Sequence, residues 1–383
     1  MSSSQCYLCG DGVGHKAGRV EVRAFQLSRD QQKGLKAKWN DNGEGVFHRD
    51  CWAKLSDGAY GRSADLELSE LEIKLVKEAR KTAEYHDSDD YITAEAKRIA
   101  QMIRNADYPV FFTGAGISTA AGIGDFRGKD GKWTERDKLK EHGTKGAKKA
   151  YKKTPLRDLR PTYTHEAIRK LVDMGIFKFV ISQNTDGIHR LSCIPASKMA
   201  ELHGNAYVQK CEKCGTRYDV GRSHRDAASQ AHNVPPKKCE RCGISHRTGR
   251  MCEKKDCGGY LMNTIINFGD YLEEQVLDAA QEHARKGDIF MCLGSTLMVS
   301  PANSLVMSGK SPHRLVICNR QATEYDTECE RVDEQGVRIG SRIHGDCDKL
   351  MKALMVELLG DEAVRDWEDG REARLLEYDE MRR

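Results

Sequence analysis

Short apolar runs, separated by longer mixed segments, recur over most of the chain after residue 100. Four of them cover residues 109–112, 177–182, 289–293 and 314–318, and most of their side chains are apolar. Strands that are apolar on both faces are typical of a parallel sheet covered by helices on each side. The pattern therefore predicts an α/β domain.

Helical spacing appears between and around these runs. A helix is predicted over residues 91–105, after the acidic turn at 86–90, and another over 349–359. Residues 63–85 also place leucine, isoleucine and valine at near-helical spacing among charged residues. We interpret them as a helix that joins two modules or packs on the α/β domain. The acidic segment 361–383 is interpreted as a C-terminal tail with a solvated face, either helical or frayed.

Composition and charge narrow the class of protein. A chain of 383 residues with a formal charge of +4 fits one large domain and a smaller module, and it is no polycation. The basic run at 138–153 is either a solvated face or a source of nonspecific attraction to nucleic acid or chromatin. No run approaches the ~18 apolar residues of a membrane span, and residues 1–5 lack the pattern of a secretory signal. We therefore expect no membrane contact and a reducing compartment, in which the fourteen cysteines favour metal over disulfides.

Paired cysteines mark two candidate metal sites. Near the start, Cys6 and Cys9 are followed by His48 and Cys51, a set with the spacing of a zinc finger. These residues predict a loop-rich module over 1–60, joined by a helical linker over 61–86.

A second half-site, Cys211-x-x-Cys214, has two competing partners. Cys239-x-x-Cys242 has the tighter spacing, whereas Cys252 and Cys257 lie farther along the chain. Spacing alone favours the first pair and leaves the choice open.

Polar motifs follow the predicted strands. The glycine turn 113–119 (TGAGIST) lets a backbone approach a pyrophosphate, although an ordinary strand-to-helix turn explains it equally well. Residues 183–186 (QNTD) place polar groups at the end of an apolar strand, which indicates a pocket. His203, before Gly204, is suited to acid–base chemistry, but a lone histidine is more often structural.

Taken in order, the segments 113–119, 122–128, 182–187 and 202–205, with the cysteine pair after them, resemble the sirtuin family of NAD-dependent protein deacylases. The resemblance covers residues 87–360. It implies a Rossmann-like parallel sheet with a small zinc-binding module inserted at about 206–265. It also implies NAD and structural zinc as cofactors, and a protein with an acylated lysine, such as a histone, as substrate.

The same resemblance assigns roles to residues. His203 would be the general base, Asn184 would position a ribose and a water, and Asp186 would bind the nicotinamide amide. The product would be O-acyl-ADP-ribose, released with nicotinamide. The further NAD contacts that it implies are Gly114, Ala115, Gly116, Ser118, Thr119, Asp125, Phe126, Arg127, Trp133, Gln183, Gly294, Ser295, Thr296, Asn319, Gln321 and Cys347. Gly124 and Thr185 stand where the family usually has a proline and an apolar residue.

Context around the second cysteine pair resembles the nuclear, class IV branch of the family and favours Cys252 and Cys257 as zinc ligands. Cys239 and Cys242 would then lie in an insertion, either binding a second metal with a histidine such as His232 or His246, or as free thiols. The N-terminal set resembles the zinc finger of poly(ADP-ribose) polymerases, which implies contact with DNA or chromatin, although a protein-binding finger fits as well. The branch implies a nuclear location, with the cytoplasm as the alternative. ADP-ribosyl transfer to protein and a non-catalytic NAD sensor remain rival functions.

Overall fold

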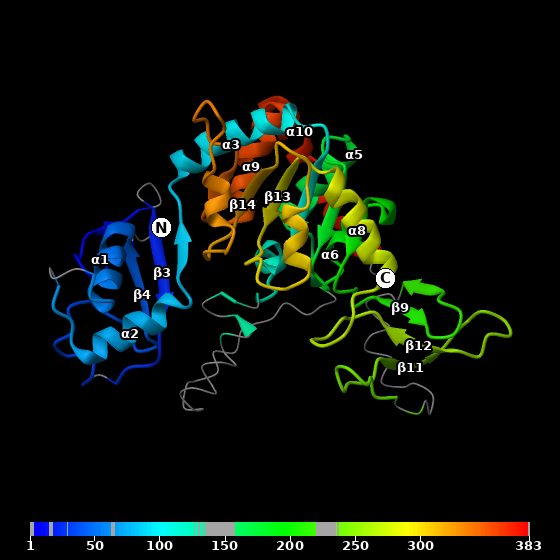
Figure 1. The fold of residues 1–383 in the computed structure, drawn as a ribbon, viewed down its shortest axis with the longest axis horizontal. Helices are drawn as coiled ribbons and strands as arrows, with labels where there is room; N and C mark the ends of the chain where they lie inside the picture. Colours follow the sequence, from blue (N-terminus) through cyan, green and yellow to red (C-terminus); the bar gives the residue numbers. More distant parts are fainter. Residues whose placement is uncertain are drawn as a thin grey trace.

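The computed structural model describes residues 4–14, 18–28, 30–62, 66–125, 127–128, 131–132, 134, 158–219, 235 and 237–381. Three parts follow one another across the molecule: an N-terminal module, a central α/β domain and a small antiparallel sheet (Figure 1). The predicted aromatic Trp133, the basic run 138–153 and His232 lie outside the described residues, as does Phe126.

The central sheet is parallel and has the strand order β15-β14-β13-β6-β7-β8. Its strands are β6 (Pro109–Thr113), β7 (Phe179–Ser182), β8 (Met199–Glu201), β13 (Ile289–Leu293), β14 (Arg314–Cys318) and β15 (Ser341–Ile343). The chain runs outward in one direction from β6 and in the other from β13, so the order reverses between these two strands. This is the Rossmann topology, and it confirms the predicted fold class.

Helices cover both faces of this sheet. One face packs on α3 (Asp89–Arg104), α5 (Tyr163–Asp173) and α9 (Cys347–Leu359), and the other on α8 (Glu274–Lys286) and η5 (Ala302–Met307). Along β6, Phe111 points into the first core, whereas Val110 and Phe112 point into the second. Burial on both faces explains why these strands read as continuous apolar runs. Short helices follow strands or precede them: η1 (Ala115–Ala121), α6 (Ile188–Leu191), η3 (Ala196–Lys198) and η6 (Asp326–Glu330).

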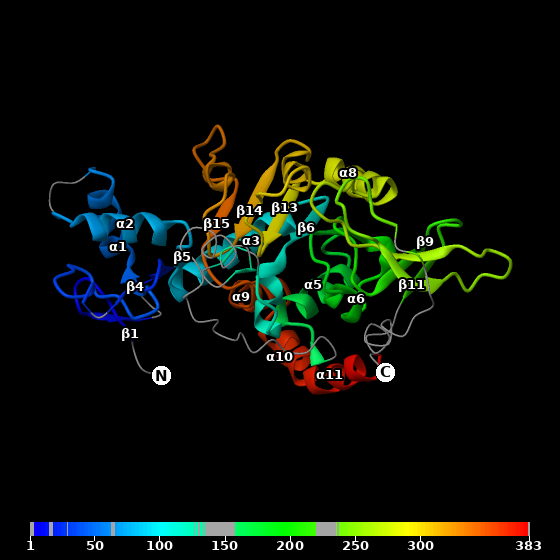
Figure 2. The ribbon, with the colours of Figure 1, turned by 90° about the horizontal axis from the view of Figure 1, so that it is seen from below.

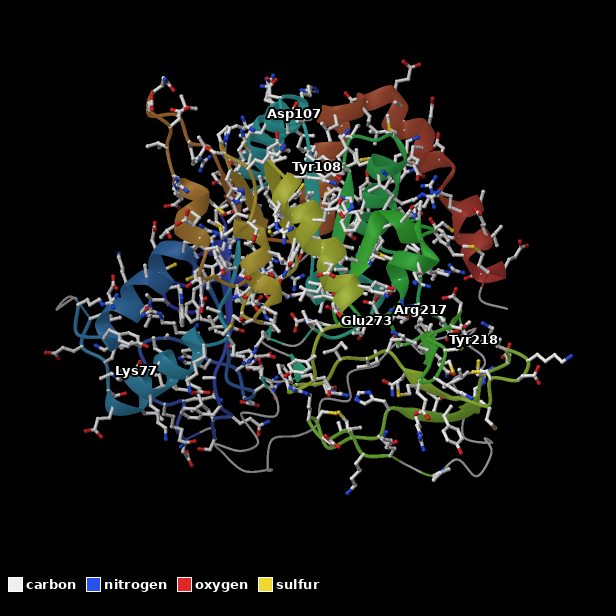
Figure 3. All side chains as sticks on the ribbon, turned by 45° about the vertical axis from the view of Figure 1, so that its right-hand side comes forward. Lys77, Asp107, Tyr108, Arg217, Tyr218 and Glu273 are labelled. Atoms are coloured by element: carbon white, nitrogen blue, oxygen red, sulfur yellow. The ribbon has the colours of Figure 1, made fainter. Side chains whose placement is uncertain are left out.

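The small sheet is antiparallel, in the order β10-β9-β12-β11. Its strands are β9 (Val208–Cys211), β10 (Arg217–Asp219), β11 (Arg247–Met251) and β12 (Tyr260–Asn263). Glu273, directly before α8, joins this sheet to the α/β domain, because its carboxylate pairs with Lys210 at 2.8 Å and with Arg217 at 2.5 Å (Figure 3).

The N-terminal module contains its own core. Its elements are β1 (Ser4–Gln5), β2 (Gly12–Val13), β3 (Arg19–Arg23), β4 (Glu44–His48), α1 (Arg49–Ala59), α2 (Glu70–Arg80) and β5 (Glu84–His86). The predicted helix over 63–85 was too long. It begins at Glu70 because Ser69 and Glu72 form a capping box, and residues 84–86 instead pair with β3. Helix α2 packs on α1 and β3, so this core extends well past residue 60.

The acidic C-terminal segment is helical, and most of its residues are exposed. It forms α10 (Asp361–Asp369) and α11 (Arg371–Glu380), which lie against the α5 and α9 side of the domain (Figure 2). The buried Glu166 of α5 pairs with Arg371 at 2.8 Å and Arg374 at 3.1 Å. A buried carboxylate requires such partners, and they fix the segment in place. Of the helices that the structure describes, none is long and apolar enough to cross a membrane.

Candidate functional site

Two glycine turns meet where the strand order reverses. After β6, the Gly114 N–H donates to the Leu293 carbonyl at 2.9 Å, and the Gly116 N–H donates to Gly294 at 2.8 Å. A Cβ on Gly116 would lie 2.6 Å from the Gly294 Cα, and Gly294 has a φ of 65°. The two turns can therefore pack together only as glycines.

The element after the first turn is short. It is η1, a seven-residue 3-10 helix capped by Gly122, whose φ is 84°. The Ser118 hydroxyl donates to Asp186, and the Thr119 hydroxyl donates to the Gly116 carbonyl. The turn itself, more than a helix dipole, shapes this end of the site.

A cavity of about 310 Å³ opens beside the turns. Seven residues predicted to contact the cofactor line it: Gly116, Thr119, Asp125, Gly294, Asn319, Gln321 and Cys347. Arg320, Asp346 and Asp348, which the sequence did not single out, also line it. The exposed Arg127 and the half-buried Ala115 and Thr296 are not among its lining residues.

Polar side chains from three strand ends form one hydrogen-bonded network. The Ser118 hydroxyl donates to the Asp186 carboxylate at 2.7 Å, and the buried Asn184 amide donates to the Gly114 carbonyl at 3.0 Å. Ser295 donates to the Gln183 side-chain oxygen at 3.0 Å. The other end of that amide, Gln183 Nε2, is buried with no partner in the described structure. A buried donor of this kind is a place where a ligand acceptor fits.

His203 lies at the end of β8, beside this network. Its Nδ1 is 3.1 Å from the Gln183 carbonyl oxygen, which can only accept, so Nδ1 carries the proton of the neutral ring and Nε2 keeps its lone pair. Burial lowers the pKa of His203 below its ordinary value, although the Gln183 carbonyl acts in the opposite direction. A neutral imidazole with a free Nε2 is a competent base near neutral pH.

Three buried polar residues to which the sequence assigned no role support this network. Thr113 Oγ1 lies 2.9 Å from both the Ser182 hydroxyl and the His189 Nε2. All three are buried among apolar strands and helices. The sequence feature that could have indicated Thr113 and Ser182 is a hydroxyl residue at the last position of β6 and of β7, where each apolar run ends.

The first metal group joins the half-site at 211–214 to the pair that spacing alone did not favour. The sulfur atoms of Cys211, Cys214, Cys252 and Cys257 all lie within 4.8 Å of one another. Cys211 faces Cys257 at 3.6 Å, and Cys214 faces Cys252 at 3.7 Å. Four thiolates with this arrangement suit a structural zinc ion, and they leave no open position for chemistry.

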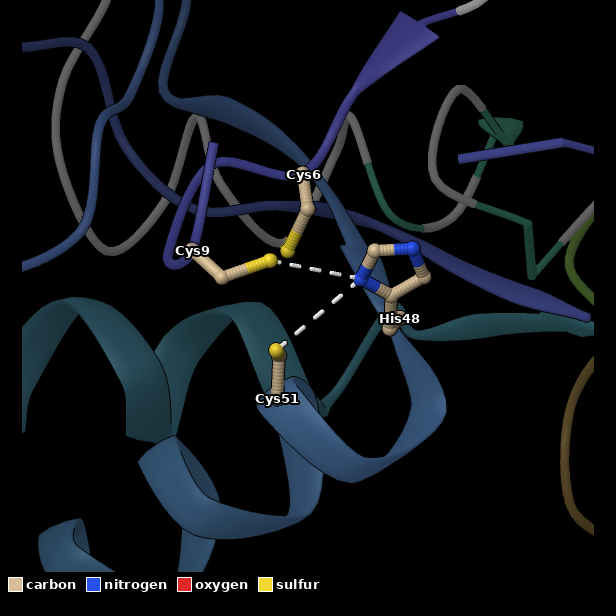
Figure 4. A group of neighbouring side chains, drawn as sticks. All are labelled: Cys6, Cys9, His48 and Cys51. Atoms are coloured by element: carbon tan, nitrogen blue, oxygen red, sulfur yellow. Dashed lines mark hydrogen bonds between the residues drawn. The ribbon is translucent and has the colours of Figure 1, made fainter. Parts of the chain in front are cut away.

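The N-terminal set also comes together, as Figure 4 shows. His48 Nδ1 lies 3.5 Å from the Cys9 sulfur and 4.0 Å from the Cys51 sulfur. Its Nε2 faces the Gly12 carbonyl at 3.2 Å, which places the ring proton on Nε2 and leaves Nδ1 for a metal. Trp52, next to the last ligand, is buried against Phe47.

Comparison with known proteins identifies the class. Residues 114–301 match the profile of the Sir2 family. The chain is 35% identical over 277 residues to the NAD-dependent protein deacetylase SRT1 of Arabidopsis thaliana, with 72% of this chain and 52% of that protein covered. It is 34% identical over 298 residues to sirtuin-7 of Homo sapiens (76% and 66% covered). With Sirt6 of Drosophila melanogaster it shares 33% identity over 276 residues (72% and 80% covered).

This chain belongs to the Sir2 family. It spans about half the length of the SRT1 relatives from two plants. Among solved structures, it is similar to a Sir2 complex with a p53 peptide and NAD+, with a TM-score of 0.48 and 26% identity over 68% of this chain and 97% of that one.

Proposed function

We propose that this chain is an NAD-dependent protein lysine deacylase. The observation that carries the proposal is the position of His203, a neutral base with a free Nε2, beside a polar network at the switch point of a Rossmann sheet. The names of the relatives, NAD-dependent protein deacetylases, support the same activity. Those named sirtuin-7 and Sirt6 support the nuclear, class IV branch and, with it, a nuclear location.

The described residues fit a bound NAD. Gly116 and Gly294 line the cavity, where their backbone can approach a pyrophosphate, and the unpaired Gln183 Nε2 offers a buried donor. Asn319 and Gln321, which also line the cavity, would hold the adenosine half. When bound, NAD would supply the ADP-ribosyl group that accepts the acyl group, with nicotinamide as leaving group.

The protein's own groups would orient the reactants and move one proton. Asn184 and Asp186 are held in place by Gly114 and Ser118, so their remaining polar atoms would position the ribose and the nicotinamide amide. His203 would accept a hydroxyl proton at Nε2 while Nδ1 stays bonded to Gln183. Residues 267–269, just beyond the Ile266 N–H that donates to the His203 carbonyl, would pair with the extended acyl-lysine peptide.

Product analysis tests the proposal. Full-length protein is incubated with NAD and a panel of acyl-lysine peptides, and nicotinamide, free peptide and O-acyl-ADP-ribose are measured by mass spectrometry. Equal amounts of the three products are expected. ADP-ribose attached to protein, with no O-acyl-ADP-ribose, would favour the transferase alternative. If no peptide leads to nicotinamide release, the NAD sensor is favoured. Each of these two results would overturn the proposed deacylase activity.

Three parts with separate tasks are proposed for the chain. The N-terminal module, extended to residue 86 by α2 and β5, is a zinc finger of the kind found in poly(ADP-ribose) polymerases, and it contacts DNA or chromatin. Residues 87–360 catalyse the reaction, and 361–383 brace the domain.

In support of DNA contact, the exposed Tyr60 is surrounded by Arg62, Lys77 and Arg80, whose charged groups lie 5.6, 5.3 and 4.8 Å from its ring centre. An aromatic face among cations suits nucleic acid.

Substitution of Lys77 and Arg80 by alanine tests this contact. DNA binding is expected to weaken, with a shallower dependence on salt, while peptide deacylation is unchanged. The half-buried Lys286 of α8, replaced by alanine, is a control that removes a cation elsewhere on the chain. If both variants bind DNA equally well, this surface is not the contact.

A further inference from the structure

The third cysteine pair, Cys239 and Cys242, lies in a turn with the same backbone bonds as the two pairs described above. In all three turns the N–H of the glycine after the second cysteine donates to the carbonyl of the first, at 2.9 Å for Gly10, 3.0 Å for Gly215 and 3.0 Å for Gly243. The first cysteine N–H donates in turn to the carbonyl five residues later, at 2.7, 2.9 and 3.0 Å. These glycines share a φ of 71° to 83°. The turn presents both sulfurs to one side, as a zinc knuckle does.

Two further ligand types face this pair. His246 Nε2 lies 3.4 Å from the Cys242 sulfur, and Asp270 Oδ1 lies 3.2 Å from the Cys239 sulfur. His246 Nε2 and Asp270 Oδ2 are 3.3 Å apart. Ligand atoms from all four residues lie within 4.8 Å of one another, and each residue is half-buried.

Neighbouring residues hold the histidine and the aspartate in this arrangement. Asn263 in β12 brings its side-chain oxygen to 3.4 Å from His246 Nδ1, and its backbone N–H donates to the His246 carbonyl at 2.8 Å. The ring proton therefore belongs on Nδ1, and Nε2 points to the cysteines. The Asn267 N–H donates to Asp270 Oδ2 at 2.9 Å. Partners of this kind orient the ligands of metal sites.

We propose that Cys239, Cys242, His246 and Asp270 bind a third zinc ion. Two thiolates, an imidazole and a carboxylate form a closed tetrahedral set, which selects zinc over calcium or magnesium. Each cysteine loses its thiol proton to solvent when the metal binds. With no open position, this zinc is structural.

This site would fix the segment next to His203. Asp270 follows residues 267–269, and the Arg241 guanidinium of the cysteine turn lies 3.1 Å from the centre of the Tyr271 ring. The metal would thus connect the turn at 239–242 to residues 266–270, whose first N–H, that of Ile266, donates to the His203 carbonyl. This consequence rests on the proposed function: if residues 267–269 receive the peptide, losing the metal raises the KM for peptide several-fold and leaves the KM for NAD unchanged.

Metal analysis of the intact protein tests the site. Protein purified without chelator is expected to hold three zinc ions per chain, and His246→Ala and Cys242→Ser two each. Cys193→Ser, a half-buried cysteine outside the metal groups, is the control and keeps three. Two zinc ions in the wild type, or no loss in folded variants, would overturn the proposal.

A measurement that needs no variant covers the case of misfolding. Wild-type crystals measured at the zinc edge are expected to show an anomalous peak between Cys239, Cys242, His246 and Asp270; a peak at the other two groups only would contradict the third site. Neither the zinc count nor the peak depends on enzymatic activity. A third zinc in a protein without deacylase activity would therefore keep this site and reject the proposed function.

Discussion

At the scale of single residues, His203 shows how surroundings turn a common side chain into a base. The Gln183 carbonyl fixes which nitrogen is protonated, and burial favours the neutral ring. Gly204, with a φ of 77°, turns the chain directly after it; a Cβ there would lie 1.8 Å from the Thr264 carbonyl oxygen. The sequence His203-Gly204 is therefore required by backbone geometry at the glycine as well as by the chemistry of the histidine.

The direction of this pKa shift predicts the pH dependence of the reaction. The active form is the neutral ring, so activity is lost as pH falls through the pKa of His203. Because that pKa is lowered, the acid limb of kcat/KM is expected below the ordinary histidine value of about 6.5, with a plateau at neutral pH. The acid limb is measured from the pH profile of kcat/KM for one substrate, NAD or peptide, with the other substrate held at a saturating concentration. An acid limb centred above pH 7 would contradict the assigned base.

At the scale of elements, the sequence was most informative where burial is complete. The runs at 289–293 and 314–318 became β13 and β14 with the predicted bounds, because both faces of these strands are buried. Residues 84–86 could not be predicted in the same way. Their strand exists because β3, more than sixty residues earlier, pairs with it, and no local pattern shows this. Spacing alone also favoured the wrong partner for the half-site at 211–214, because a long-range contact decides it. The pairing of β9 with β12 determines which sulfur atoms meet.

The start of α2 offers an element-scale test. Ser69 accepts from the Glu72 N–H at 3.3 Å and the Glu72 carboxylate accepts from the Ser69 N–H at 3.0 Å. Ser69→Ala removes half of this capping box and is expected to cost about 1 kcal/mol. Faster hydrogen exchange of the α2 amides would report this loss of stability. Ser197→Ala, a substitution at an exposed serine, serves as control. Equal protection of α2 in both variants would show that packing alone defines the helix.

At the scale of the whole molecule, the N-terminal module contacts the wall of the candidate NAD cavity. The Tyr85 N–H donates to the Arg320 carbonyl at 2.9 Å. The buried Glu84 carboxylate lies 3.4 Å from the Arg320 guanidinium and 3.3 Å from the Gln321 amide, and both of these residues line the cavity. Residues 84 and 85 therefore connect the N-terminal module to the wall of this cavity.

This contact predicts that a change in the module alters cofactor binding. Glu84→Gln weakens the hold on Arg320 and Gln321, so the KM for NAD is expected to rise about fivefold, or ~1 kcal/mol, with kcat and the peptide KM nearly constant. Steady-state kinetics with each substrate varied in turn measures this. Glu282→Gln, which changes an exposed pair with Lys286, serves as control. An unchanged KM for NAD would show that the module and the cavity touch without being coupled.

The central claim is that His203 is the base of a lysine deacylase, and one variant tests it most directly. In His203→Ala, NAD binding by calorimetry should stay near the wild-type value because His203 does not line the cavity of about 310 Å³, and its ring bonds to the Gln183 backbone carbonyl and not to that residue's side-chain amide. Deacylation of the best peptide should fall by about 10²- to 10⁴-fold, the range that a general base contributes. A folded, zinc-loaded variant that binds NAD and deacylates at a rate near that of the wild type would contradict the account.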